Sequence, residues 1–282
     1  MFMTVQPRAD YAAVSCPAPE TVPELKLYLL PEPGAVSMQP ERPLVIVVPG
    51  GGYEYCSARE AEPIAMKLLA AGIHAAVLRY SCAPARWPAA ALELAWSIRY
   101  IRSRAAEWHV NAVAVCGFSA GGHLAGTLGT LWHRPEFAAQ PMAEISCRPD
   151  FQLLCYSVLT LGEFTHPRSR ENLLGVSPDS PAGRAGIESL SLEKHVTRQT
   201  PPAFLWHTAA DGSVPVENSL MYASACRRNG VPFELHVYET GGHGLATCEP
   251  LTARGPEQVV PDDTGWLDCA LRFIRRRVPE KP

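Results

Sequence analysis

The chain has 282 residues, of which 47% are hydrophobic and 19% are charged, a composition typical of a soluble globular protein. Its formal net charge of -3 gives no electrostatic reason to expect a nucleic acid or an anionic membrane surface as a partner. No apolar run approaches the roughly 20 residues needed to cross a bilayer, and residues 1–10 lack the apolar core of a signal peptide, so we expect a cytoplasmic protein that is not bound to membranes.

This length is enough for one domain with a sizeable core, and we expect a single domain over residues 1–282. Residues 1–22, rich in Ala and Pro, predict an N-terminal arm with little structure of its own. The alternating pattern over 24–30 predicts a half-exposed edge strand, whereas the β-branched run over 44–48 predicts a strand buried on both faces of a sheet. A Pro-rich loop is expected over 31–43.

Apolar runs alternate with helical patterns along the rest of the chain. Further strands are expected over 74–80, 112–116, 151–157, 203–207 and 233–238. Helices are expected over 60–71, 88–106, from the turn at 119 to about 131, over 217–229 and over 264–277. Residues 161–202, with many Pro, Gly and Ser, are expected to form an irregular insert near the functional site. Strands that alternate with helices predict an α/β protein with a mostly parallel sheet covered on both faces.

Nine cysteines, an odd number with no C-x-x-C pair, predict buried free thiols rather than disulfides or a metal site. Cys116 lies beside the motif described next, but no base for it is evident in the sequence.

The most informative motif is Gly117-Phe118-Ser119-Ala120-Gly121, which follows an apolar strand and opens a helical segment. This G-x-S-x-G pattern predicts a sharp turn that lifts a serine hydroxyl above the sheet, with glycines where strand and helix nearly touch. A serine hydroxyl becomes a good nucleophile only when a base takes its proton and a carboxylate orients that base.

The expected order along such a chain is serine, acid, histidine. Asp211 follows the strand over 203–207, whereas Asp262, Asp263 and Asp268 lie near or in the last helix and are expected to be solvated or to cap it. His243, in the glycine-rich loop after the strand over 233–238, is the candidate base.

The other histidines have less favourable positions. His123, just after the serine turn, is expected to pack within its helix, and His74, His207 and His236 are expected to pack in the core. His166 and His195, in the insert, are candidates for the wall of a substrate pocket.

An acyl-transfer site also needs backbone N–H groups that stabilise the oxyanion. Ala120 follows the serine, and the run Pro49-Gly50-Gly51-Gly52-Tyr53 lies in the loop that supplies the second donor in proteins with this motif. The same run lacks the Lys-Ser/Thr of a phosphate-binding loop.

These four motifs together resemble those of the α/β-hydrolase fold, in the esterase and lipase superfamily. The similarity runs from about residue 24 to residue 277 and is greatest to bacterial acetyl xylan and feruloyl esterases, which are associated with xylanases. Esterases of the hormone-sensitive-lipase type carry a histidine before the three glycines, where this chain has Pro49.

The resemblance implies a central sheet of about eight strands with a minimal cap. It also implies a catalytic set of Ser119, Asp211 and His243, with an oxyanion hole formed by the amides of Gly51, Gly52 and Ala120.

We therefore expect a serine esterase that removes short acyl groups from a small-molecule or oligosaccharide ester, without a metal or organic cofactor. Tyr53, Glu54 and Tyr55 are expected to bind the substrate. A feruloyl esterase, a prolyl-oligopeptidase-like peptidase and an acyltransferase remain alternatives on the same scaffold, and a protein that only binds a ligand is a fourth. The sequence leaves the oligomeric state open.

Overall fold

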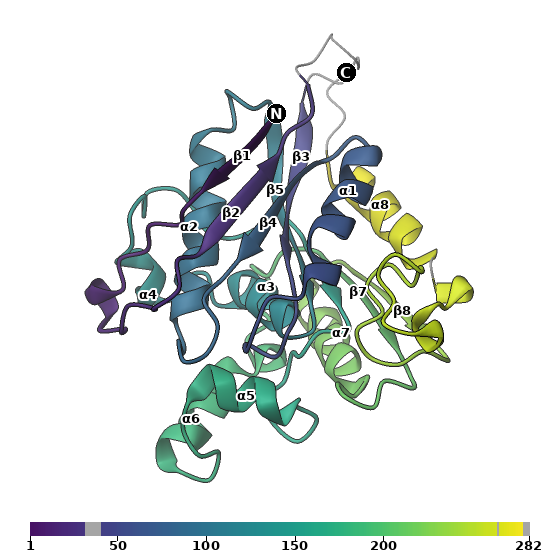
Figure 1. The fold of residues 1–282 in the computed structure, drawn as a ribbon. Coiled ribbons are helices and arrows are strands. Elements are labelled where there is room, and N and C mark those ends of the chain that lie inside the picture. The colour runs from purple at the N-terminus through teal and green to yellow at the C-terminus, as the bar shows by residue number, and fades with distance from the viewer. Residues whose placement is uncertain (32–40, 264, 279–282) are drawn as a thin grey trace.

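The structure is a computed structural model that describes residues 1–31, 41–263 and 265–278 (Figure 1). Its strands are β1 (Phe2–Val5), β2 (Glu24–Tyr28), β3 (Arg42–Val48), β4 (His74–Arg79), β5 (Val110–Phe118), β6 (Gln152–Cys155), β7 (Ala203–Thr208) and β8 (Phe233–Tyr238). Its α-helices are α1 (Glu62–Ala70), α2 (Ala89–Ser103), α3 (Ala120–Thr130), α4 (Pro135–Ala138), α5 (Pro167–Leu174), α6 (Pro181–Leu190), α7 (Glu217–Asn229) and α8 (Gly265–Arg277).

All eight strands form one sheet in the order β1-β2-β4-β3-β5-β6-β7-β8. The pairs β1–β2 and β2–β4 are antiparallel, and every pair from β4 to β8 is parallel. The carboxyl ends of β3 to β8 therefore lie at one edge of the sheet, where ligands bind in open α/β sheets.

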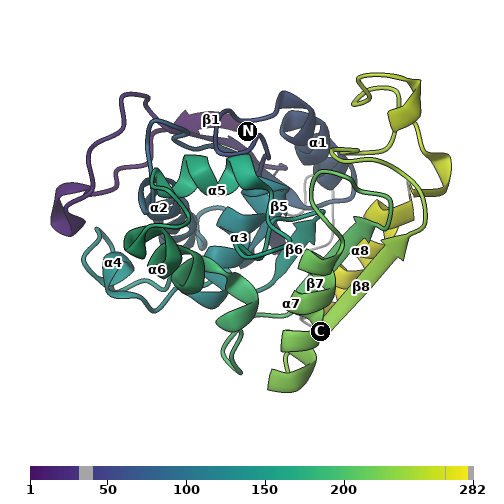
Figure 2. The same cartoon turned by 90° about the horizontal axis from the view of Figure 1, so that it is seen from below.

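Helices cover both faces of this sheet (Figure 2). Residues of α2, α3 and α7 pack in one hydrophobic cluster, and residues of α1 and α8 pack in the other. Strand β3 shows why its sequence is apolar throughout, since Leu44, Ile46 and Val48 belong to the first cluster and Val45 and Val47 to the second. The predicted fold class is confirmed.

The N-terminal arm is a point where the sequence prediction was wrong. Residues Phe2–Val5 form β1, which pairs with β2 from Phe2 opposite Tyr28 to Val5 opposite Leu25. The strand β2 is thus not at the sheet edge, although its side chains alternate between buried and half-buried as expected. A strand of four residues whose partner residues lie at least twenty positions away leaves no periodic signal in the sequence.

The segment 161–202 is also more regular than predicted, because it contains α5 and α6. Pro167 and Pro181 occupy the first turns of these helices, and the side chains of His166 and Ser180 cap their N-termini. Gly175 ends α5 in the left-handed conformation. Proline, serine and glycine here mark the starts and ends of helices rather than a continuous loop.

The remaining predictions concern loops, cysteines and membrane spans. The loop expected over 31–43 falls mostly on residues 32–40 and so lies outside the described residues, while Arg42 and Pro43 already belong to β3.

All nine cysteines are free, and six of them are buried. No helix in the described part of the chain is long and apolar enough to cross a membrane.

Candidate active site

Ser119 lies at the turn between β5 and α3, at the carboxyl edge of the sheet. Its φ of 53° and ψ of -120° are a strained backbone conformation for a residue other than glycine. Two backbone hydrogen bonds hold the turn: the amide of Ser119 donates to the carbonyl of Cys155 at 3.0 Å, and the amide of Val158 donates to the carbonyl of Ser119 at 3.1 Å.

The glycines on either side of Ser119 are required by the close approach of helix and sheet. A Cβ atom at Gly121 would lie 2.2 Å from the carbonyl oxygens of Val48 and Pro49, and one at Gly117 would lie 2.3 Å from the carbonyl oxygen of Gly121. Real Cβ atoms do not approach backbone atoms so closely. The glycines of the G-x-S-x-G pattern therefore allow α3 to begin directly against β3.

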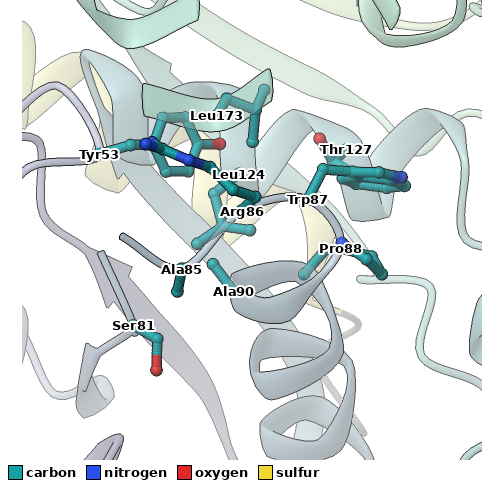
Figure 3. Close-up of a pocket in the computed structure, with 11 residues that line it drawn as sticks. Tyr53, Ser81, Ala85, Arg86, Trp87, Pro88, Ala90, Leu124, Thr127 and Leu173 are labelled. Carbon is teal, nitrogen blue, oxygen red and sulfur yellow. The ribbon is translucent and has the colours of Figure 1, made fainter. Parts of the chain in front are cut away.

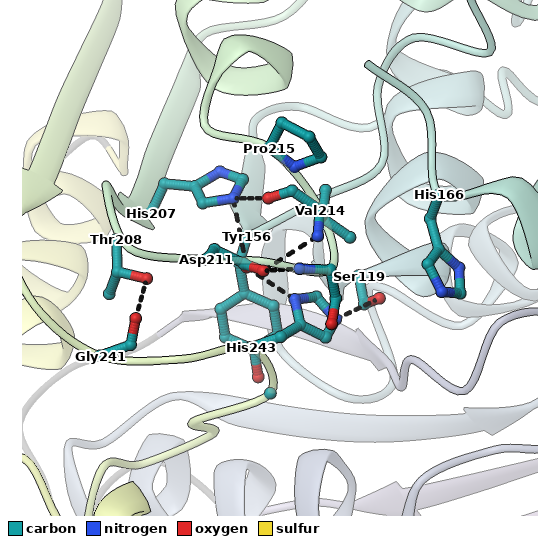
Figure 4. A network of polar contacts seen from close by, with 12 residues as sticks. Ser119, Tyr156, His166, His207, Thr208, Asp211, Val214, Pro215, Gly241 and His243 are labelled. Carbon is teal, nitrogen blue, oxygen red and sulfur yellow. Dashed lines mark hydrogen bonds and ion pairs between the residues drawn. The ribbon is translucent and has the colours of Figure 1, made fainter. Parts of the chain in front are cut away.

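The structure brings the three predicted residues into one row of hydrogen bonds (Figure 4). The distance from His243 Nε2 to Ser119 Oγ is 2.8 Å, and the distance from His243 Nδ1 to Asp211 Oδ2 is 2.7 Å. Because an ionised carboxylate only accepts hydrogen bonds, Nδ1 carries the imidazole proton and Nε2 is free to accept the serine proton.

Asp211 is held by four donors, and its side chain has no exposed surface. Its Oδ1 accepts the amides of Ser213 and Val214, each at 2.9 Å. Its Oδ2 accepts from His243 and lies 3.4 Å from His207 Nε2, which donates mainly to the carbonyl of Val214 at 2.9 Å. His207 is thus a buried core histidine, as predicted, that also faces the carboxylate.

These contacts determine the protonation state of Asp211. Burial alone would raise the pKa of this carboxyl group, but the hydrogen bonds from His207 and His243 outweigh that effect and hold the pKa well below its usual range. Asp211 therefore remains ionised throughout the neutral range.

We expect the protein to lose stability as the pH falls below about 4, in part through Asp211. A carboxyl group whose pKa is lower in the folded state stabilises that state above the unfolded pKa and loses this contribution as the pH falls through the folded pKa. The midpoint of urea unfolding, measured from pH 7 to pH 3, should converge for the wild type and Asp211→Asn as the pH falls. A constant difference between the two proteins would contradict this assignment.

The three predicted oxyanion donors share one feature. The amides of Gly51, Gly52 and Ala120 donate to no acceptor within the described residues, whereas the amide of Gly50 donates to Glu60 Oε2 at 2.9 Å. Gly51 and Gly52 have φ angles of 127° and 65°, which favour glycine.

A cavity of about 250 Å³ lies over Ser119 and His243, and Gly51 and Gly52 are part of its wall. Glu54 and Tyr55 line it as predicted, and their role in substrate binding stays a prediction. The other residues around it are mostly polar: Ser57, Arg59, Glu60, His166, Arg168, Ser213, Gly244, Arg254 and Gln258.

Charged groups of the cavity wall differ in how they are paired. Arg168, on α5, donates from two nitrogens to the carboxylate of Glu54, which lowers the pKa of Glu54. The other two arginines of the wall donate to neutral groups instead. Arg59 donates to the side chain of Gln258 and to the carbonyl of Gly244. Arg254 donates to the hydroxyl of Tyr55. His166 is also in the wall, and burial, together with the charge of His243, lowers its pKa.

Tyr53 does not line this cavity, which corrects the prediction for that residue. Its side chain is 4% exposed, and its hydroxyl donates to His123 Nδ1 at 2.9 Å. Tyr53 faces a separate cavity of about 10 Å³ beside the connection from β4 to α2, with Trp87 and Leu173 among its walls (Figure 3). That cavity has room for about one water molecule and none for an ester.

The inward position of Tyr53 follows from its partner. Burial lowers the pKa of His123 to about 4, so its imidazole is neutral and can accept from the tyrosine. The other imidazole nitrogen, Nε2, lies 2.9 Å from the carbonyl of Leu190, so His123 joins α3 to α6. This agrees with the packing role expected for it.

Several residues at the site have no signal in the sequence motifs. Glu60 was interpreted as part of a helix and Tyr156 as part of a strand, but both lie beside the serine turn and the His243 loop. Asp263 is 2% exposed, so it is not solvated, and the alternative that it caps the last helix stays a prediction. In the described ranges, no three His, Cys, Asp or Glu side chains converge to hold a metal ion.

Comparison with known proteins gives one family. A family model described as BD-FAE matches residues 33–225, which include Ser119 and Asp211 but not His243. The crystal structure of an acetyl ester-xyloside bifunctional hydrolase from Caldicellulosiruptor lactoaceticus is 37% identical, with a TM-score of 0.79, and the match covers 91% of this chain and 89% of that one.

Two curated proteins are also similar. An endo-1,4-beta-xylanase B of Butyrivibrio fibrisolvens is 36% identical over 216 residues, or 74% of this chain and 33% of that protein. An acetylxylan esterase of Xylanibacter ruminicola is 31% identical over 220 residues, or 74% of this chain and 43% of that protein. The chain thus spans less than half the length of both curated relatives. Together these matches confirm the predicted resemblance to the α/β-hydrolase esterases in family and in fold.

Proposed function

This chain belongs to the BD-FAE family, and from that membership we propose that it is a serine esterase that removes short acyl groups, such as acetyl, from carbohydrates. The hydrogen-bonded row from Ser119 through His243 to Asp211, beside a cavity at the carboxyl edge of the sheet, is the observation that carries the proposal. The names of two relatives, an acetylxylan esterase and an acetyl ester-xyloside hydrolase, support the choice of an acetylated sugar.

In the first half of the reaction, Ser119 Oγ attacks the ester carbonyl carbon while His243 Nε2 takes the hydroxyl proton. Negative charge then develops on the former carbonyl oxygen. The unused amides of Gly51, Gly52 and Ala120 are suited to donate to that oxygen. Asp211 stabilises the imidazolium that forms on His243 without taking its proton.

The tetrahedral intermediate collapses when the bond to the leaving alcohol breaks. His243 gives its proton to the alcohol oxygen, and the acyl group remains on Ser119. Water then attacks the acyl-enzyme, with His243 again as the base, and the carboxylic acid is released.

The size and polarity of the cavity support a short acyl group on a sugar. Its volume of about 250 Å³ is small for a ligand pocket. Arg59, Arg254 and Gln258 place hydrogen-bonding groups at its wall, and these suit the hydroxyl groups of a carbohydrate better than a lipid chain.

We expect acetyl esters to be better substrates than feruloyl esters, with kcat/KM higher by about 10-fold or more, because most residues around the cavity are polar and suit an aromatic acyl group poorly. The measurement is a comparison of acetyl, butyryl and feruloyl esters that share one sugar alcohol, together with acetate release from acetylated xylan.

The same panel separates the alternatives. Equal or faster feruloyl hydrolysis would favour a feruloyl esterase, and faster cleavage of peptide amides would favour a peptidase. Transfer of the acyl group to an added sugar, in preference to water, would favour an acyltransferase.

A further inference from the structure

Glu60 is a buried carboxylate beside the proposed oxyanion loop, and the mechanism above does not use it. Its residue is 4% exposed. Its Oε2 accepts the amide of Gly50 at 2.9 Å, and its Oε1 accepts the hydroxyl of Tyr156 at 2.7 Å. No Lys, Arg or His in the described part of the chain forms an ion pair with it. One backbone amide and one phenol thus donate to the two oxygens of this buried side chain, one to each.

Tyr156 joins this carboxylate to the loop that carries His243. Its hydroxyl also accepts the amide of Ala246 at 3.0 Å. Its ring lies edge-on to the imidazole of His243, with 5.2 Å between ring centroids and 75° between planes (Figure 4). Burial, followed by the nearby Glu60, raises the pKa of Tyr156 well above 10, so the hydroxyl keeps its proton and remains a donor.

The backbone of Tyr156 indicates that this arrangement is maintained at a cost. Its φ of 35° lies in the left-handed region, which is unusual for a bulky residue. Gly50 packs against Glu60 so closely that a Cβ atom on Gly50 would lie 2.7 Å from Glu60 Oε2. Strained and closely packed groups of this kind are frequent where a site needs fixed geometry.

From these contacts we propose that Glu60 and Tyr156 are positioning residues for the esterase reaction, so the inference rests on the proposed function. Glu60 fixes Gly50, and thereby the directions of the amides of Gly51 and Gly52 that follow it. Tyr156 fixes Ala246 and the ring of His243. The pair thus sets the oxyanion donors and the base at a constant distance from each other.

Such a role predicts a loss in kcat rather than in substrate affinity. A displacement of about 1 Å at the reacting centre costs on the order of 10²-fold in rate. We expect Tyr156→Phe and Glu60→Gln each to lower kcat for an acetyl ester by about 10- to 100-fold, with KM changed by less than about 2-fold. The double variant should lose little more than the single variants, because both remove the same connection.

The chain offers matched controls away from the site. Glu93 is a second buried glutamate that accepts one amide, that of Ser81 at 2.7 Å, and one tyrosine hydroxyl, that of Tyr11 at 2.8 Å. Tyr222 is a second fully buried tyrosine, whose hydroxyl accepts from Gln152. Glu93→Gln and Tyr222→Phe should change kcat by less than about 2-fold, even where they lower the melting temperature.

A further measurement separates positioning from a general loss of structure. A boronic acid forms a tetrahedral adduct with a serine nucleophile and so mimics the oxyanion. Its inhibition constant should rise in Tyr156→Phe and Glu60→Gln by about the factor by which kcat falls, while it stays constant in the two control variants.

Three outcomes of this experiment contradict the inference. In the first, the Glu60 and Tyr156 variants fold and keep the wild-type kcat. In the second, the two control variants lose as much kcat as the Glu60 and Tyr156 variants. In the third, kcat falls but the affinity for the boronic acid does not change. An inactive wild-type protein would instead overturn the proposed function, and the inference with it. Rates for the wild type and for Ser119→Ala, measured first, keep these two failures apart.

Discussion

Ser119→Ala is expected to lower kcat for ester hydrolysis by at least about 10⁴-fold, since no other group at the site replaces the nucleophile. The Ser119 hydroxyl lies 2.8 Å from His243 Nε2, and its removal leaves the base without an attacking oxygen. A small residual rate is expected, because the oxyanion donors and the binding cavity remain. Release of p-nitrophenol from p-nitrophenyl acetate measures the loss.

A fluorophosphonate probe gives an independent readout, because it labels only an activated serine. Labelling should disappear in Ser119→Ala and persist in Ser224→Ala, where the serine lies exposed on α7 and its hydroxyl accepts from Arg228. If Ser119→Ala kept more than a tenth of the wild-type kcat, Ser119 would not be the nucleophile.

Asp211→Asn is expected to lower kcat by about 10⁴-fold while it leaves the fold intact. Two backbone amides, those of Ser213 and Val214, donate to Oδ1 of the aspartate and will hold the amide oxygen of an asparagine in the same place. The new NH₂ group must then face Nδ1 of His243. That contact favours the tautomer with a proton on Nε2, which is unable to accept the proton of Ser119.

The matched control is Asp150→Asn. Asp150 also accepts a backbone amide, that of Val113 at 2.7 Å, and pairs with Arg102; neither side chain lines the cavity. We expect its kcat to stay within about 2-fold of the wild type. Wild-type activity in folded Asp211→Asn would show that His243 is oriented by another group.

The sequence predicted the regular elements of the sheet well, because their signals are local. The run over 44–48 is apolar on both faces of β3, and the predicted bounds of α7 and β8 coincide with those in the structure. The errors fall where the same residue types are common in two kinds of structure. Serine and proline are frequent in loops, but here Ser180 caps the N-terminus of α6 and Pro181 is its first residue.

The candidate site divides in the same way. Ser119, Asp211 and His243 could be selected from the sequence because each lies in a turn after a strand, and parallel strands bring such turns to one edge. Tyr53, which follows the three glycines, was expected to bind the substrate. Its actual position depends on His123, which lies 70 residues further along the chain, and no sequence pattern indicates that contact.

By itself, the amino-acid sequence determined the alternation of strands and helices, the serine turn and the order of the three candidate catalytic residues. These features depend on hydrophobic periodicity and on glycine, properties that act over a few residues. Only the tertiary structure decided which amides stay unused, which way Tyr53 points and that Glu60 meets Tyr156, 96 residues away in the chain. Contacts of this kind depend on how the strands pair and how the helices pack, and so they arise only when distant parts of the chain are brought together.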